Sequence, residues 1–385
     1  MAQRSITKRV LFRLHWIAGI TAGLVLAVVG ATGGVIGFEE EILALANPQL
    51  RLAEDGRPAL PPDRWVAAAR AAYPGHVVRS VAWEGDAEPV EVRVAQGKSR
   101  GDTIALDPRD GRVLGERRGA AFIAATEKLH RTLAAGPVGK QVVGASTALL
   151  ILLTLSGIYL RWPRRARSPA AWLKLDFRLK GRGFLWHLHA VTGTWLLLFY
   201  LVAAFTGLWW SYGWYREGVN RLAGITTPLR RPQPPATPAD AIPPSIDLAW
   251  AGFRAAAPDA TRASFSPGEP GKPVEIRYQT PSSPHERAWD TLTLDRASGA
   301  VLEQEHHADQ PAGRRFVQAL FPLHAGSFFG TPGRVLMSLA SLLLPLFAIT
   351  GIWLWMLRRR MEARRAGAAP ARASPAPRQV QPGRA

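Results

Sequence analysis

The chain of 385 residues contains no cysteine, which excludes disulfide bonds, thiolate metal sites and a cysteine nucleophile. Acidic residues are also few, with 29 Asp and Glu against 48 Lys and Arg. The resulting net charge of +19 would suit a nucleic-acid-binding protein. However, segments 1–13, 161–183 and 358–385 hold 20 of the basic residues and only two acids. Because each segment borders an apolar span, the positive-inside rule explains the charge better, and we expect no nucleic-acid partner.

Four spans are long and apolar enough to cross a lipid bilayer, which takes about 20 residues for about 30 Å of hydrocarbon. They cover residues 14–38, 142–160, 185–212 and 335–357. None contains Asp or Glu, which argues against a proton relay, because relays usually bring carboxylates into the membrane. The first span has the basic start of a signal peptide, but no Ala-x-Ala site ends it and its motif recurs in the third span. We therefore expect a retained helix.

The basic segments define the expected orientation in a bacterial inner membrane. With the lead 1–13, the loop 161–184 and the tail 358–385 in the cytoplasm, both termini lie inside. Segments 39–141 and 213–334 then lie in the periplasm. The tail is rich in Ala, Pro and Arg, and we expect it to be disordered.

Two histidine motifs occur twice, which identifies an internal duplication. Leu-His-x3-Gly occurs at His15 and His189, 174 residues apart. Leu-His-x5-Gly-x2-Gly occurs at His130 and His324, 194 residues apart. Dipeptides of a hydroxyl residue and glycine recur at the same two offsets: Thr32-Gly33 with Thr206-Gly207, and Ser156-Gly157 with Thr350-Gly351.

Each half also carries an external segment in which one helix precedes several short strands. In the first, Asp63 is a candidate N-cap, and residues 107–114 read Asp-x3-Gly-x-Val-Leu, a turn between strands. The second repeats this turn at 295–302. The sequence therefore predicts an α-helical membrane protein with four transmembrane helices, built as an internal duplication, and two small α+β periplasmic domains.

The four repeated histidines are the strongest functional signal. His15 and His189 lie near the inner ends of their spans, and His130 and His324 lie at the outer interface. A single such histidine is most often structural, but matched pairs suggest two sites, each with one histidine from each half. Zinc would require three or four ligands, and no carboxylate recurs beside these histidines. A b-type haem takes two axial imidazoles, so haem is the favoured cofactor.

Small residues near the inner pair would let a flat cofactor slide between helices. Gly19 and Gly193, each four residues after its histidine, are predicted to pack against a haem held by His15 and His189. His187 is two residues from His189 and points elsewhere on a helix. It is an interface residue, an alternative ligand or a partner of a haem propionate.

The remaining histidines carry weaker signals. His76 and His285 are expected to be exposed to solvent. His306 and His307 follow the last strand of the second external segment, near the outer membrane face. They are either surface residues or lie near an external substrate.

The duplicated histidine motifs, the Gly-Ile-x-Leu span endings and the two Asp-x3-Gly-x-Val modules resemble those of the PepSY-associated transmembrane proteins, also described as iron-regulated membrane proteins. The resemblance covers nearly all of residues 10–360. It implies two periplasmic PepSY-like modules. As in members similar to the ferrioxamine-type siderophore reductases, it also implies two b-type haems. Those members reduce ferric siderophores in the periplasm. Reduction releases the iron, because hard oxygen ligands hold iron(II) less tightly than iron(III).

The resulting hypothesis is a dihaem b-type ferric-siderophore reductase. His15 and His189 would ligate the inner haem, and His130 and His324 the outer one. The chain has no Gly-rich dinucleotide fingerprint, so a separate flavoprotein reductase or the quinone pool is the expected electron donor. A non-catalytic PepSY regulatory or binding protein is the alternative, and a siderophore permease component is another. Haem content separates the first two, and the sequence leaves the oligomeric state open.

Overall fold

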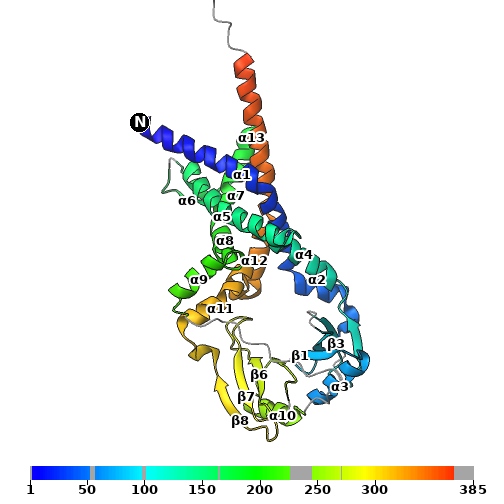
Figure 1. The fold of residues 1–385 in the computed structure, drawn as a ribbon. Coiled ribbons are helices and arrows are strands. Elements are labelled where there is room, and N and C mark those ends of the chain that lie inside the picture. Colours follow the sequence, from blue (N-terminus) through cyan, green and yellow to red (C-terminus); the bar gives the residue numbers. More distant parts are fainter. Residues whose placement is uncertain are drawn as a thin grey trace, which may run out of the picture.

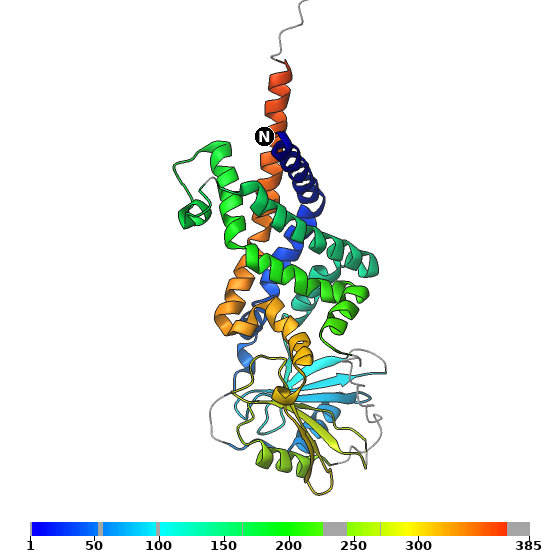
Figure 2. The same ribbon diagram turned by 90° about the vertical axis from the view of Figure 1, so that its left-hand side faces the viewer.

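A helical part and a β-sheet follow one another along the long axis of the molecule (Figure 1). The N-terminus and the end of helix α13 (Leu344–Gly367) lie at the helical end, away from the sheet (Figure 2). Most of the tail that the sequence predicts to be disordered lies outside the described residues. The computed structural model describes residues 2–52, 57–97, 101–163, 165–225, 245–269 and 271–367.

Within the residues that the structure describes, three helical segments are long and apolar enough to cross a membrane. The first is Ile6–Ile36, within α1 (Ala2–Ile36), and the second is α5 (Gly136–Arg161). The third is Ser327–Arg364, which contains η3, α12 and most of α13. η3 covers Ser327–Phe329 and α12 covers Gly330–Leu342.

The segment expected to be one straight third span is bent. Helices α7 (Gly181–Trp195) and α8 (Leu197–Ser211) meet at 61°, and they form a fourth span only if the bent pair counts as one. The break lies at Leu196, whose φ of −95° and ψ of 0° depart from α-helical geometry. No proline marks this break, so hydropathy alone indicates a continuous span.

Two further helices carry the outer histidines to the membrane helices. α4 (Ala120–Thr132) packs along α1, and α11 (Ala312–Ala325) packs against α8. α4 ends at Leu133, which has a left-handed φ of 49°, and α11 ends at Gly326, with a φ of 84°. These ends turn the chain, so that the next helix begins a few residues later. The helical part is completed by α2 (Glu39–Ala46), η1 (Pro48–Leu50), α6 (Pro169–Leu173) and α9 (Gly213–Leu222).

The external segments form one antiparallel sheet rather than two separate ones. Its strand order is β4-β3-β2-β1-β5-β6-β7-β8, and Ala82 of β1 pairs with Ser264 of β5 at the joint between the halves. The two expected α+β segments therefore share a single sheet. The strands are β1 (Val77–Trp83), β2 (Val90–Ala95), β3 (Asp102–Leu106), β4 (Val113–Glu116), β5 (Arg262–Phe265), β6 (Val274–Gln279), β7 (Asp290–Leu294) and β8 (Val301–Glu305).

Helices α3 (Pro62–Ala72) and α10 (Asp247–Ala256) cover the sheet at the end far from the membrane helices (Figure 1). Their first turns exchange hydrogen bonds. The Asp247 carboxylate accepts from the backbone N–H of Asp63 at 3.0 Å, and the Asp63 carboxylate accepts from the N–H of Ile246 at 3.1 Å. The expectation that Asp63 is the N-cap of its own helix is wrong, because α3 begins at Pro62 with Pro61 as its N-cap. The Asp63 carboxylate instead joins the two helices across the joint.

A single apolar core continues through both halves of the external part. Trp250 of the second half makes T-shaped contacts with Trp65 and Trp83 of the first, at centroid distances of 5.8 and 5.6 Å. Because these large rings pack across the joint within one core, the two halves are expected to unfold together.

Candidate cofactor site

The four repeated histidines lie in two pairs, each with one member from each half of the chain. His15 of α1 faces His189 of α7, with ring centroids 6.4 Å apart and an interplanar angle of 74°. His130 of α4 faces His324 of α11, with centroids 6.3 Å apart and an angle of 67°. The two pairs therefore have almost the same geometry, as expected if the duplication built both.

Hydroxyl groups hold the two inner rings. Nδ1 of His15 lies 2.8 Å from Oγ of Ser156, and Nδ1 of His189 lies 2.7 Å from Oγ1 of Thr350. Each hydroxyl already donates its hydrogen to a carbonyl of its own helix at 2.6 Å, so its oxygen must accept from the imidazole. The hydrogen bonds thus assign the ring hydrogen to Nδ1 and leave the lone pair on Nε2.

The outer rings have two acceptors each. Nδ1 of His130 lies 2.9 Å from the carbonyl oxygen of Val29 and 3.3 Å from Oγ1 of Thr32. Nδ1 of His324 lies 3.1 Å from the carbonyl oxygen of Ala203, and Oγ1 of Thr206 lies 2.9 Å from the same atom. A carbonyl oxygen cannot donate, so Nδ1 carries the hydrogen here as well. All four Nε2 atoms therefore present lone pairs.

A glycine follows each of the four hydroxyl residues and packs against the same imidazole. A Cβ on Gly33 would lie 2.9 Å from Cε1 of His130. For the other three glycines the distance to Cε1 of the facing histidine would be 3.4–3.7 Å. They are Gly157 against His15, Gly207 against His324 and Gly351 against His189. The hydroxyl–glycine dipeptides that repeat with the histidine motifs thus contact the histidine rings, and we call them the histidine seats.

The predicted packing glycines occupy different places. A Cβ on Gly19 would meet Leu153 at 3.8 Å, and one on Gly193 would meet Phe347 at 3.4 Å. Phe347 in turn packs on His189, with centroids 5.2 Å apart. Neither glycine touches an imidazole, so any role in holding a flat cofactor stays a prediction.

The pair separations suit one metal ion that would be held between two imidazoles. Two metal–nitrogen bonds of about 2.0–2.1 Å place the ring centroids about 6 Å apart. Within the described part of the chain, no third histidine, carboxylate or cysteine joins either pair to form a metal cluster. The other coordination positions would therefore come from the bound group, which is the donor set of a bis-imidazole haem. The residues present fit a b-type haem at each pair.

The two pairs lie near opposite ends of the membrane helices. On α1, His15 and the seat residue Gly33 are about 27 Å apart along the helix axis, close to the hydrocarbon thickness of about 30 Å. An apolar core separates the pairs, with Tyr200 as its one polar side chain. It consists of Ala22, Leu26, Leu150, Leu196, Tyr200, Ala204, Ala340 and Leu344.

His187 takes no part in the inner pair. Its Nε2 lies 3.1 Å from the carbonyl oxygen of Lys174, in the segment between α6 and α7, and its ring contacts Trp186. The helix places it away from His189, as the two-residue spacing predicts. Of the two candidates for the inner site, the structure brings His189 to His15.

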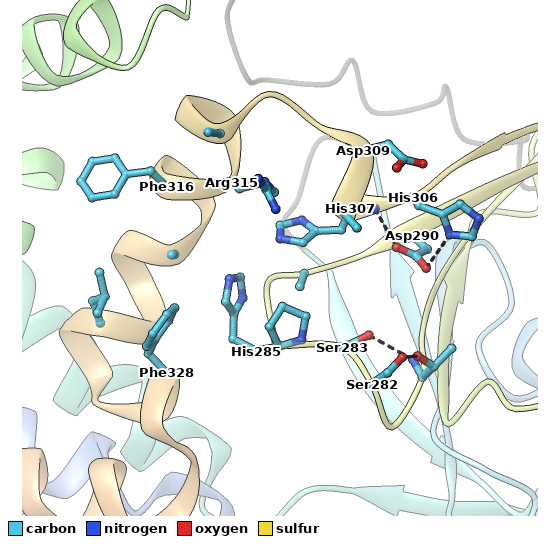
Figure 3. A pocket seen from close by; sticks show the side chains of 17 residues that line it. Ser282, Ser283, His285, Asp290, His306, His307, Asp309, Arg315, Phe316 and Phe328 are labelled. Atoms are coloured by element: carbon cyan, nitrogen blue, oxygen red, sulfur yellow. Dashed lines mark hydrogen bonds and ion pairs between the residues drawn. The ribbon is translucent and has the colours of Figure 1, made fainter.

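A cavity of about 700 Å³ lies between the β6–β7 loop, η2 (His307–Asp309) and α11 (Figure 3). Its wall includes Leu323, the residue before His324 on α11, so the cavity and the outer pair share this helix. The rings of His285 and His307 stand at its centre, with centroids 5.5 Å apart.

His285 and His307 are buried, at 8% and 6% exposure. The expectation that His285 is solvent-exposed is wrong, because its ring packs against Phe328 at 5.8 Å. Burial is the main cause that lowers the pKa of both histidines. His306, in contrast, is half-exposed and pairs with Asp290 at 3.1 Å. The other carboxylate oxygen of Asp290 accepts from the backbone N–H of His307 at 2.7 Å and so positions that residue.

Comparison with known proteins agrees with the membrane helices. The model of the family described as the PepSY-associated TM region matches residues 12–358. An uncharacterized protein of Pseudomonas aeruginosa is 30% identical over 254 residues, which are 60% of this chain and 62% of that protein. The chain thus matches less than two thirds of the length of this relative.

Proposed function

The chain belongs to the family of the PepSY-associated TM region, and we propose that it is a dihaem ferric-siderophore reductase of the bacterial inner membrane. In this proposal, electrons pass from a separate flavoprotein reductase or the quinone pool to a periplasmic ferric siderophore, and the iron leaves as iron(II). The observation that carries the proposal is the pairing of His15 with His189 and of His130 with His324. Every ring in these pairs has its Nε2 lone pair free.

A b-type haem bound at each pair would supply a one-electron carrier. The chain's part is to hold the four imidazoles in one tautomer and one orientation. Acceptance of the Nδ1–H hydrogen bond by a hydroxyl or carbonyl oxygen makes Nε2 a better electron donor to a metal. The apolar core between the pairs excludes water. No side chain needs to act as an acid or a base in one-electron transfer.

The proposed orientation counts α7 and α8 as one span, which gives four, and places both termini in the cytoplasm. The N-terminus, the segment around α6 and the end of α13 all lie at the end away from the sheet (Figures 1 and 2), and these segments carry most of the net positive charge. The positive-inside rule puts that end in the cytoplasm and the sheet in the periplasm.

The cavity that shares α11 with the outer pair is the proposed substrate site. Its volume of about 700 Å³ suits a small chelate, since ligand pockets typically measure about 300–1,000 Å³. His306 and His307, which the sequence suggested near a substrate, both line it. A chelate held there would lie beside His324 without entering the membrane. Arg315 and Phe316 at the cavity wall would contact it from the side of α11.

The test is a reduced-minus-oxidised optical spectrum of the purified full chain, with the haem quantified as the pyridine haemochrome. We expect about two b-type haems per chain, because each pair supplies two axial imidazoles. His15→Ala and His324→Ala should each lose one haem, and His76→Ala, in the external part, should keep both. Reduction of a ferric siderophore, read as iron(II) captured by a coloured chelator, should then require both pairs.

Other outcomes would redirect the assignment. One haem in the wild type would mean that one histidine pair has another role. No haem, in protein made with ample haem supply, would refute the reductase and favour a non-catalytic PepSY regulatory or binding protein. Transport of labelled siderophore into vesicles without formation of iron(II) would instead support a permease component.

A further inference from the structure

Arg161 is a buried cation at the inner end of α5. Its exposure is 8%, and its polar contacts are with neutral oxygens. Nη1 donates to the hydroxyl of Thr194, and Nη2 donates to the carbonyl oxygen of Ala171 at 3.1 Å. The ring of Trp172 lies 5.7 Å from the guanidinium carbon. Among the residues that the structure describes, no carboxylate pairs with Arg161. Buried charges are normally paired, so this cation lacks an expected partner.

The position of Arg161 connects it with the inner histidine pair from two helices. On α5, Gly157 packs against His15 and lies four residues earlier, on the same helix face. Helical side chains lean toward the N-terminus of their helix, so the Arg161 side chain leans back toward that glycine. On α7, its partner Thr194 directly follows Gly193. The guanidinium of Arg161 therefore lies near residues that surround the inner pair.

We propose that Arg161 is the anion-binding residue of the inner site and pairs with a carboxylate of the cofactor held by His15 and His189. This inference rests on the proposed function, because haem b carries two carboxylates as its only anionic groups. A guanidinium binds a carboxylate through two parallel hydrogen bonds and stays charged at any physiological pH. Thr194 and Ala171 orient the guanidinium without neutralising it.

His187, which the sequence offers as a partner of a haem propionate, is not placed for that role. That histidine has its Nε2 at the carbonyl oxygen of Lys174 and contacts no residue of the inner pair. A lipid phosphate at the inner membrane face has the same anionic oxygen chemistry as a carboxylate. The experiment therefore separates the two sources.

The test compares haem b with its dimethyl ester, in which both carboxylates are blocked. Full-length apo-protein with His324→Ala, which keeps only the inner pair, is titrated with each form, and the dissociation constants are read from the Soret band. With Arg161 present, the ester should bind about 10- to 150-fold more weakly, the range for hydrogen bonds to charged groups. Arg161→Gln should abolish this preference, and Arg161→Lys should retain part of it. Arg165→Gln removes an exposed charge of the same segment and should leave the preference intact.

Equal binding of both forms with Arg161 present would overturn the assignment and leave the reductase standing. A preference that survives Arg161→Gln, together with loss of acidic phospholipid from the purified variant, would overturn it in favour of a lipid. If the parent bound neither form while the wild type bound one haem, the inner pair would have another role and this assignment would fall; absence of haem from the wild type as well would refute the reductase. Redox titration of the holoprotein provides a check without reconstitution. Arg161→Gln should lower the potential of the inner haem, because loss of a nearby cation favours iron(III), and leave the outer haem unchanged.

Discussion

Removal of the seat hydroxyls should weaken the inner site more than the outer site. Ser156 provides the one acceptor within hydrogen-bond distance of Nδ1 of His15, whereas Nδ1 of His130 has the carbonyl of Val29 as well as Thr32. Ser156→Ala leaves a buried N–H without a partner, which costs about 1–3 kcal/mol. That free energy corresponds to about a 5- to 150-fold faster loss of haem if the ring leaves its ligating orientation. Thr32→Val should change the outer site by less than about threefold, because the carbonyl remains.

Haem transfer to an excess of apomyoglobin measures this loss. The inner variants are made in the His324→Ala background and the outer ones in the His15→Ala background, so that one haem is followed at a time. Thr154→Val is the matched control, because the hydroxyl of Thr154 bonds the carbonyl of Leu150 in its own helix and no imidazole. Equal loss at the inner and outer sites, or an equal effect of Thr154→Val, would refute the reasoning.

Two further predictions follow from packing and from burial. Gly33→Ala would place a methyl group 2.9 Å from Cε1 of His130, so the outer haem content should fall. Gly23→Ala, on the same helix, would place its Cβ at an ordinary 3.6 Å from Ala348; it should leave the haem content unchanged and serves as the control. Burial lowers the folded-state pKa of His285 and His307 below the value near 6.5 that they have when unfolded. Their contribution to stability is therefore complete above about pH 6.5 and is lost as the pH falls through the folded pKa. Thermal unfolding between about pH 7.5 and 5 should show this loss, and His285→Asn should make it smaller; an equal loss in the variant would contradict the assignment.

The sequence alone identifies the four histidines that form the two pairs in the structure. The offsets of 174 and 194 residues distinguish the four repeated histidines from the other five. The same offsets mark the hydroxyl–glycine dipeptides, but their contact with the imidazoles depends on helix packing between segments about 100 to 160 residues apart, as for His130 with Thr32 and His189 with Thr350. A pattern that repeats with the histidines, and at the same spacing, was the available signal for the seats.

Other features depend on long-range contacts that no local pattern encodes. At the joint of β1 with β5, Trp65, Trp83 and Trp250 share one core. These residues lie far apart in the sequence, so no local pattern shows that they meet. The burial of His285 arises from η2 and from Phe328, which lie in other segments. The bend at Leu196 lacks the proline that would have marked it.

The direction of the hydrogen bond at Nδ1 separates the histidines that can ligate a metal from the one that can serve a substrate. In both membrane pairs Nδ1 donates, so Nε2 carries the lone pair. In the external cavity, Nδ1 of His285 instead accepts from the backbone N–H of Arg287 at 3.2 Å. Its neutral ring therefore carries the hydrogen on Nε2, and it presents a donor rather than a lone pair. The close pair His285 and His307 is thus unsuited to bind a haem iron, and the N–H donor of His285 would suit the oxygen atoms of the proposed chelate.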